Sequence, residues 1–204
     1  MRLGLISDIH CNLGALEVAL DQMSGRVDEI LCAGDAIFQF RFSNEVVAKL
    51  REVGARMVLG NHEDVVLGRH GERVRAHPQT DPELLRWLSE QPRRIDTVIE
   101  GKRLTMFHAT PHEPPYDYVY AGSARMQEFG QLGADYVIYG HTHRELAQRV
   151  NGTLVVNPGS TGQPRNPGNG FRVSYAILDT QSGEVSVELF DDPTRPRQAV
   201  GGSR

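Results

Sequence analysis

The sequence predicts an α/β domain, in which buried strands alternate with amphipathic helices. Short apolar runs alternate with stretches of helical periodicity over the first two-thirds of the chain, and two hairpin signals follow in the last third. The composition, 39% hydrophobic and 24% charged residues, is typical of a soluble globular protein. A chain of 204 residues is also long enough to bury a sizeable core without disulfides.

The first sixty residues contain three short apolar runs that read as buried strands, at 3–7, 30–33 and 56–59. After the first run, apolar residues recur at helical spacing at Leu13, Leu16, Leu20 and Met23. Ser43 is expected to cap a second helix, and Gly54 comes just past the expected end of that helix. This order of strand and helix is the pattern of a parallel sheet with crossover helices.

The middle of the chain begins with a more polar stretch, 62–94. We expect this stretch to form a helical insertion that covers one edge of the functional site. Within it, Asp81 followed by Pro82 is typical of a helix start with proline at the first helical position. A hairpin is expected around residues 100–102, and a further helix over 123–132 is expected to lead into a strand at 136–139.

The last third predicts two more strand pairs. Asn151-Gly152 is a strong signal for a type I′ turn between strands at 145–150 and 153–156. A second pair is expected on either side of Ser182-Gly183. We therefore expect one domain over residues 1–190, followed by a flexible tail, 191–204, that is rich in proline, arginine and glycine.

Charge and cysteine content exclude several classes of protein. A net charge of -4 gives no support for nonspecific nucleic-acid binding, which usually needs a basic face. Cys11 and Cys32 are too few for a secreted disulfide framework, so a reducing cytoplasm is the expected location. No run of 18 uninterrupted apolar residues indicates a membrane span.

Side chains that can bind metals come directly after five of the predicted strands. They are Asp8, His10, Asp35, Asn61, His62, His108, His141 and His143. In an open α/β sheet, ligand sites form beyond the carboxyl ends of the strands, so these groups can converge on one point. Glycine directly before Asp35, Asn61 and His141 fits sharp turns at which the backbone leaves the sheet.

These residue types suit two divalent ions of the first transition row. Carboxylate, imidazole and amide donors are hard to borderline ligands, and two carboxylates, one amide and four imidazoles fill two four-ligand shells if one carboxylate bridges. Two ions ~3.5–4 Å apart would clamp a phosphate and lower the pKa of a bridging water toward neutrality. The resulting hydroxide could attack phosphorus in line with the departing oxygen.

Each motif taken alone has an ordinary structural explanation. Asp8-Ile-His10 could be a turn, His108 a buried core histidine, and Asn61 with Glu63 a helix N-terminus. The histidine pair at 141 and 143 is the strongest single signal, because paired histidines after a strand rarely serve packing. The conjunction of all the pieces, each at a strand end, favours a metal site.

These motifs together resemble the calcineurin-like metallophosphoesterase superfamily. The resemblance rests on Asp8-x-His10, Gly34-Asp35, Gly60-Asn61-His62-Glu63, His108 and Gly140-His141-x-His143. A closer similarity to its compact bacterial and archaeal phosphodiesterase branch comes from the run at 157–165 and from Asn44-Glu45-Val46-Val47. The resemblance covers residues 3 to about 190 and implies a four-layer αββα sandwich of two mixed sheets flanked by helices.

The resemblance also implies a role for each motif residue. One metal would be held by Asp8, His10, Asp35 and His143. The second would be held by Asp35, Asn61, His108 and His141, so that Asp35 bridges the two. His62 would contact the phosphate and assist the leaving group, as a hydrogen-bond donor or as a general acid. Manganese is the first expectation for both ions, with iron, nickel or zinc as alternatives.

Four features of the sequence depart from the family's pattern or lie beside it. Leu59 stands where the protein phosphatase branch has a phosphate-gripping arginine, which argues against that branch. Cys11 replaces a usual glycine and could be either a reactive thiol or a small buried side chain. The alternating Phe38, Phe40 and Phe42 could line a base-stacking wall or pack the loop. His112 is a candidate for a second phosphate contact.

The expected activity is hydrolysis of a small phosphodiester or, as a second choice, a phosphomonoester. A catalytically weak scaffold on the same fold is the main alternative, since a retromer-type subunit resembles this superfamily. A nuclease is disfavoured because the chain lacks a basic stripe. The expected partner is thus a small phosphate ester, with neither membrane nor nucleic acid, and the sequence allows a homo-oligomer.

Overall fold

Two five-stranded mixed sheets form the centre of the protein. The computed structural model describes residues 1–113 and 115–195. The first sheet has the strand order β10-β9-β1-β2-β3. Its strands are β1 (Arg2–Ile6), β2 (Glu29–Cys32), β3 (Arg56–Met57), β9 (Val173–Asp179) and β10 (Val185–Phe190). The parallel strands β1, β2 and β3 lie side by side, and β9 joins β1 antiparallel.

The second sheet has the order β4-β5-β6-β8-β7. Its strands are β4 (Arg94–Ile99), β5 (Lys102–Phe107), β6 (Tyr136–Ile138), β7 (Glu145–Val150) and β8 (Thr153–Pro158). Strands β5, β6 and β8 are parallel, and the hairpins β4–β5 and β7–β8 close its two edges. Asn151 and Gly152, between β7 and β8, both have positive φ, as the predicted type I′ turn requires.

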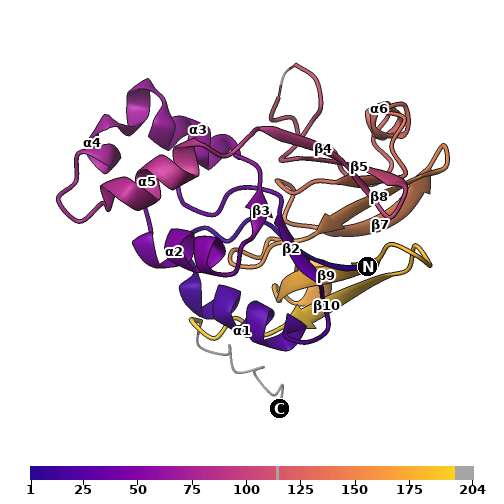
Figure 1. The fold of residues 1–204 in the computed structure, drawn as a ribbon, viewed down its shortest axis with the longest axis horizontal. Helices are drawn as coiled ribbons and strands as arrows, with labels where there is room; N and C mark the ends of the chain where they lie inside the picture. The colour runs from indigo at the N-terminus through magenta and orange to yellow at the C-terminus, as the bar shows by residue number, and fades with distance from the viewer. Residues whose placement is uncertain (114, 196–204) are drawn as a thin grey trace, which may run out of the picture.

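Helices cover the outer faces of both sheets, as the predicted αββα sandwich requires. Figure 1 shows α6 and α1 on opposite sides of the molecule, with the sheets between them. The helices are α1 (Leu13–Met23), α2 (Asn44–Glu52), α3 (Asn61–Leu67), α4 (Glu72–Arg75), α5 (Pro82–Ser89) and α6 (Met126–Gly130). Two 3₁₀ turns, η1 (Arg69–Gly71) and η2 (Pro167–Asn169), complete the described elements.

The alternation of side chains along each strand divides the core into layers. Leu3 and Leu5 of β1 point between the two sheets and pack with Tyr136 and Ile138 of β6. The next residue of β1, Ile6, points the other way and packs against α1 and α2. On the far side, Val137 packs with α6. The sheets therefore bury both faces, which accounts for the uninterrupted apolar runs in the sequence.

Helix caps follow the predicted signals. The Ser43 side chain accepts a hydrogen bond from the amide of Val46, and the Asp81 side chain caps α5 with Pro82 at its first position. One helix is shorter than predicted: α6 covers only Met126–Gly130, whereas the sequence indicated 123–132. Residues 124 and 125 instead form a turn before α6.

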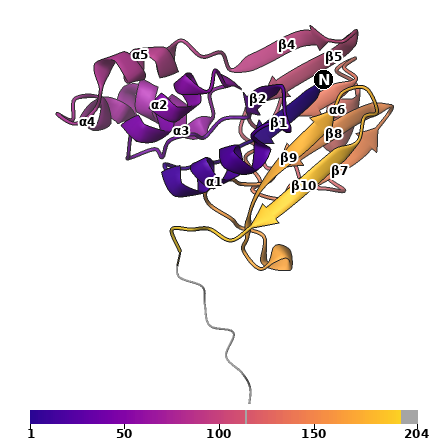
Figure 2. The ribbon, with the colours of Figure 1, turned by 60° about the horizontal axis from the view of Figure 1, so that its bottom comes forward.

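The segment from β3 to β4 is helical and contains α3, η1, α4 and α5. Figures 1 and 2 show these helices gathered with α2 at one end of the two sheets. No helix within residues 1–113 and 115–195 is long and apolar enough to span a lipid bilayer. The expected tail at 191–204 lies largely outside the described residues and stays a prediction.

Candidate metal centre

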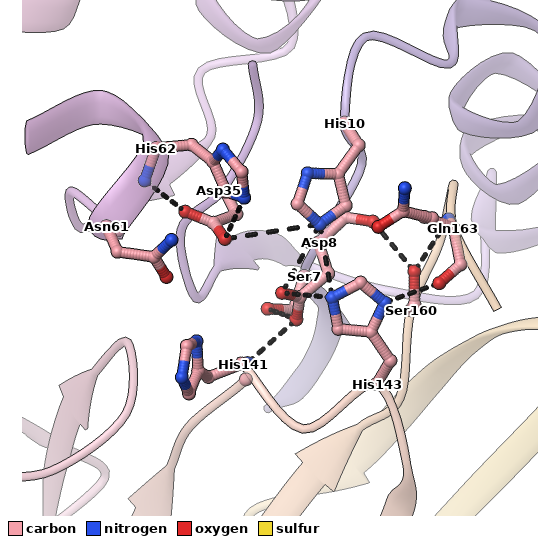
Figure 3. A network of polar contacts seen from close by, with 12 residues as sticks. Ser7, Asp8, His10, Asp35, Asn61, His62, His141, His143, Ser160 and Gln163 are labelled. Carbon is pink, nitrogen blue, oxygen red and sulfur yellow. Dashed lines mark hydrogen bonds and ion pairs between the residues drawn. The ribbon is translucent and has the colours of Figure 1, made fainter. Parts of the chain in front are cut away.

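The polar residues that follow the predicted strands come together at the strand ends of both sheets. Figure 3 shows most of them around a common centre. Asp8 and His10 follow β1, Asp35 follows β2, Asn61 and His62 begin α3, His108 follows β5, and His141 and His143 follow β6. Both sheets therefore contribute to one cluster.

Three overlapping sets of side chains place ligand atoms within 4.8 Å of one another. They are Asp8 with His10 and His143, His10 with Asp35 and His62, and Asp35 with His108 and His141. The first and third sets coincide with most of the two predicted shells. Asn61 belongs beside the third, because its Oδ1 lies 3.1 Å from Nε2 of His108.

One oxygen of Asp35 lies between the first and third sets. Its Oδ1 accepts a hydrogen bond from the amide of His62 at 3.0 Å. Its Oδ2 lies 3.2 Å from Nε2 of His108 and 4.0 Å from Nε2 of His10. Because Oδ1 is already occupied, Oδ2 is the oxygen that faces both sets.

Asp8 offers a buried oxygen that has no hydrogen bond. Its Oδ2 accepts from the Ser7 hydroxyl at 2.6 Å and from the amide of His141 at 2.9 Å. Its Oδ1 is buried without a hydrogen-bond partner among the described residues, 3.2 Å from Nε2 of His143. Leaving a buried carboxylate oxygen unpaired is costly, so this atom fits a cation ligand.

The spacing of the imidazole nitrogens also fits a cation. Nε2 of His10 lies 3.1 Å from Nε2 of His143, and Nδ1 of His141 lies 3.2 Å from Nε2 of His108. Two nitrogens bound at about 2.0–2.1 Å to one tetrahedral ion would lie ~3.3 Å apart. The residues present are therefore consistent with divalent metal ions in both sets.

Three of the histidines are oriented by backbone carbonyls. Nδ1 of His108 donates to the carbonyl of Ala33 at 2.7 Å, and Nε2 of His141 donates to that of Tyr116 at 2.9 Å. Nδ1 of His143 likewise donates to the carbonyl of Gln163. A hydrogen on the outer nitrogen leaves the lone pair of the inner nitrogen for a metal.

The electrostatics of the cluster favour charged carboxylates. Burial opposes ionisation of Asp8, but the neighbouring histidines, His143 first, outweigh it and hold the pKa of Asp8 well below its usual range. Burial also opposes ionisation of Asp35, and His108 likewise lowers the pKa of that carboxyl. Both carboxylates are therefore in the form that binds metal.

The histidines differ in how they titrate. Burial lowers the pKa of His10 to about 4 and that of His141 to about 4, so both rings are neutral. Burial also favours the neutral form of His108, but Asp35 and Asp8 outweigh it and raise the pKa of His108 to about 10. His108 thus supplies positive charge to the carboxylates, a role that a bound cation would take over.

Five of the seven predicted ligands have left-handed backbone conformations. They are Asp8 (φ 53°), His10 (φ 49°), Asp35 (φ 54°), His141 (φ 67°) and His143 (φ 54°). Non-glycine residues adopt this region rarely, at a cost of about 1–3 kcal/mol each. Backbone strain that collects at one cluster indicates that the fold gives up stability to aim these side chains.

The glycines beside the cluster serve close approach more than tight turns. Of the three glycines singled out in the sequence, only Gly34 has a positive φ, 95°. A Cβ on Gly60 would lie 2.2 Å from Oδ1 of Asp35, and one on Gly140 would lie 1.9 Å from the Ser7 hydroxyl. Any side chain at these two positions would push the ligands apart.

Glu63 is a positioning residue, a role that neither its helix-start signal nor its place in the Gly60-Asn61-His62-Glu63 motif indicated. Its buried carboxylate accepts hydrogen bonds from the amides of Asp35 (2.9 Å), Gly60 (2.7 Å) and Ile37 (3.0 Å). Burial, together with the Asp35 charge, raises the pKa of Glu63 to about 7. The side chain ties the loop after β2 to the start of α3.

His62 lies on the rim of the cluster, with its ring fixed on one side. Its Nδ1 accepts a hydrogen bond from the amide of Gln39 at 2.8 Å, and its ring stacks on Phe38 with centroids 4.8 Å apart. Burial lowers its pKa. His62 is therefore a neutral ring with its hydrogen on Nε2, which lies 3.7 Å from Oδ2 of Asp35.

The three phenylalanines of the loop after Asp35 have separate roles. Phe38 borders the cluster through His62, and Phe42 packs against the core. Phe40 is 70% exposed. Another aromatic side chain contacts the cluster directly. The ring of Tyr118 stacks on that of His141 with centroids 4.2 Å apart, a contact that no sequence motif indicated.

Neither Cys11 nor His112 is among the candidate ligands of the cluster. Cys11 is buried, its thiol donates to the carbonyl of Arg41, and burial raises its pKa to about 11. It is therefore a small buried side chain and not a reactive thiolate. His112 is exposed, and its predicted phosphate contact stays a prediction.

The fold and the cluster have counterparts among known proteins. The sequence profile of the calcineurin-like phosphoesterase superfamily domain matches residues 1–183. The crystal structure of a metallophosphoesterase from Sphaerobacter thermophilus is 28% identical with a TM-score of 0.78, over 94% of this chain and 89% of that one. An uncharacterized protein from Methanocaldococcus jannaschii is 28% identical over 212 residues, 91% of this chain and 85% of its own length.

A structure described as a novel archaeal phosphodiesterase shares the fold, with 23% identity and a TM-score of 0.63 over 93% of this chain and 100% of that one. Two mixed sheets with a cluster of carboxylates and imidazoles at their strand ends, together with the family match, place the chain among the metal-dependent hydrolases that act on phosphoric esters. Within that class, the chain belongs to the calcineurin-like phosphoesterase superfamily.

Proposed function

We propose that this protein hydrolyses small phosphodiesters with two divalent ions bound at the cluster. The observation that carries the proposal is the position of Asp35, whose Oδ2 faces the donors of His10 on one side and of His108 on the other. A carboxylate oxygen shared in this way is suited to bridge two ions. The proposed ligands are Asp8, His10, Asp35 and His143 for one ion, and Asp35, Asn61, His108 and His141 for the other.

Two bound divalent ions would supply an attacking hydroxide at neutral pH and neutralise charge on the phosphate. The chain's own contribution is to hold the donors in place before substrate arrives. Backbone carbonyls orient three of the imidazoles, and Glu63 fixes the loops that carry Asp35 and Asn61. Such preorganisation avoids reorganisation during the reaction.

The proposed role of His62 is to donate a hydrogen bond to the phosphate or to the departing oxygen. Because its Nδ1 accepts the Gln39 amide, its Nε2 carries the hydrogen. A neutral imidazole is a good donor but a very weak acid. Of the two roles considered for this residue, the geometry favours the hydrogen-bond donor over the general acid.

The missing arginine at position 59 and the placement of Arg41 support a diester over a monoester. A diester carries one negative charge at the scissile phosphate, whereas a monoester carries up to two, which guanidinium groups commonly bind. Leu59 is buried where the protein phosphatase branch has an arginine. Arg41, in the loop after Asp35, lines a separate cavity.

The proposal also covers the native metal, the cellular location and the partner of the protein. Manganese is the proposed native metal, because carboxylate, amide and imidazole donors without thiolate suit it. A cytoplasmic location is proposed from the two free, buried cysteines, Cys11 and Cys32. The proposed partner is a small phosphate ester, without nucleic acid or membrane.

The test is manganese-dependent release of nitrophenol from bis-p-nitrophenyl phosphate, with p-nitrophenyl phosphate as the monoester. We expect the diester to be the better substrate. His62→Ala should keep its metal and lose about 10²–10³-fold in kcat, as expected for removal of one hydrogen-bond donor. His62→Gln, which restores an N–H near the position of Nε2, should recover part of that loss if His62 acts as a donor.

Two results would count against the proposal. Metal-loaded protein that is no more active than His62→Ala would contradict the enzyme and favour a scaffold on the same fold. If His62→Gln were as slow as His62→Ala, the donor role would be wrong and the general acid would replace it. Metal content must be measured in each variant, so that lost ions are not mistaken for lost chemistry.

A further inference from the structure

A cavity separate from the metal centre lies between the loop after Asp35 and the helical segment that follows β3. Its volume is about 1030 Å³, at the top of the range for small-molecule sites. Residues of η1 and α4, and the start of α2, contribute to its walls, at the end of the molecule where these helices gather (Figure 1). The lining side chains include Phe40, Arg41, Glu45, His70, Arg73 and His77.

One tight turn joins this cavity to the metal centre. Phe38 and Arg41 exchange backbone hydrogen bonds of 3.1 and 2.8 Å across the turn. Phe38 stacks on His62, while Phe40, whose ring centroid is 6.5 Å from that of Phe38, lines the cavity. The same turn therefore borders His62 with Phe38 and lines the cavity with Phe40.

The cavity presents an excess of positive charge. Arg41 and Arg73 are exposed; neither forms a salt bridge within residues 1–113 and 115–195, although the charge of Arg41 acts on the carboxylate of Glu45. Glu45 is the one acidic residue in the lining, and its carboxylate accepts from the Ser43 hydroxyl. Two guanidinium groups against one carboxylate, in a protein of net charge -4, favour an anion.

The cavity also presents an aromatic surface. The Phe40 ring is 70% exposed, the largest fraction among the exposed large hydrophobic side chains of the described residues. Stacking of a nucleobase on an aromatic side chain is worth about 1–3 kcal/mol. A planar ring beside guanidinium groups is the combination that recognises a nucleotide.

We propose that this cavity binds the distal nucleotide of the substrate, with its base on Phe40 and its terminal phosphate between Arg41 and Arg73. The substrate class is then a 5′-phosphorylated dinucleotide, which is a small phosphodiester. Hydrolysis adds the oxygen of water to the internal phosphorus, breaks one P–O ester bond, and leaves a phosphomonoester and an alcohol that takes up a proton. This assignment rests on the function proposed for the metal centre.

Binding to metal-free protein tests the cavity separately from catalysis. Adenosine 5′-monophosphate and adenosine are titrated calorimetrically in the presence of EDTA. We expect the nucleotide to bind at least 10-fold more tightly than the nucleoside in the wild type and in Arg51→Gln. Arg51 is an exposed arginine of α2 that does not line the cavity. The double variant Arg41→Gln/Arg73→Gln should reduce this ratio to less than 3-fold.

Turnover gives the second readout, as the ratio of kcat/KM for the dinucleotide pApA to that for ApA. We expect a ratio above 10 in the wild type and below 3 in the double variant, whereas Phe40→Ala should lower both values together. Equal values for pApA and ApA in the wild type, or an unchanged ratio in the double variant, would overturn the assignment. Bis-p-nitrophenyl phosphate has neither nucleobase nor second phosphate, so loss of its hydrolysis would instead refute the function of the metal centre.

Discussion

Gly140→Ala tests whether the close approach of the two sheets positions the metal ligands. The added Cβ would lie 1.9 Å from the Ser7 hydroxyl and 2.7 Å from Oδ2 of Asp8. Both distances are far inside the 3.5–4.0 Å of a normal carbon contact. Since the φ of Gly140 is not in the left-handed region, the effect is one of space and not of backbone strain.

The size of the effect follows from what must move. The Ser7 hydroxyl has to rotate away and lose its 2.6 Å hydrogen bond to Asp8, at about 1.5–3 kcal/mol for a charged acceptor. The overpacking that remains costs about 1–3 kcal/mol. Together these give a loss of about 2.5–6 kcal/mol, or roughly 5–24 °C in Tm for a chain of this length.

The assay is equilibrium unfolding in EDTA, followed by a manganese titration. Gly25→Ala is the matched control: nothing lies within 4 Å of its added Cβ and its φ is +69°, so only backbone strain of about 1–2 kcal/mol is expected. Adding Ser7→Ala to Gly140→Ala removes the nearest clash. The two changes should therefore couple by at least about 1 kcal/mol.

Two results would refute this reasoning. The first is a Gly140→Ala variant whose stability and manganese affinity lie within the range of Gly25→Ala. The second is strict additivity of the Ser7 and Gly140 substitutions, because residues that clash directly cannot act independently.

Three further predictions concern the metal centre. Asp35→Asn should lose both ions, because one oxygen faces both sets of donors. Two full metal equivalents by elemental analysis would contradict this, and Asp96→Asn, which affects an exposed pair with Arg94, should keep them. Tyr118→Ala should remove about 0.5–1.5 kcal/mol of stacking on His141 and so weaken manganese binding roughly 2–13-fold in calorimetry. Tyr118→Phe keeps the ring and should bind manganese like the wild type. Manganese at 100 times its Kd should stabilise the fold by about 2.7 kcal/mol for each ion bound and raise Tm by roughly 5–11 °C per ion, a shift that EDTA reverses. No shift would mean that the folded cluster binds no ion.

Much of the scaffold could be predicted from local signals. Ser43, Asp81 and the Asn151-Gly152 turn act within a few residues of themselves, so their caps and turn were predictable. The strand ends were predictable for a similar reason, since apolar runs stop where polar side chains begin. The prediction was weakest for α6, whose ends depend on its packing against β7 and β8.

The sequence by itself determined which donors this protein can offer and that each follows a strand. The tertiary structure decided which atoms face one another, as with Nε2 of His10 and Nε2 of His143, 3.1 Å apart although 133 residues separate them. It also decided the role of Glu63 and the walls of the separate cavity. The physical reason is that these contacts join segments distant in the chain, whose relative placement depends on how both sheets pack and not on any local pattern.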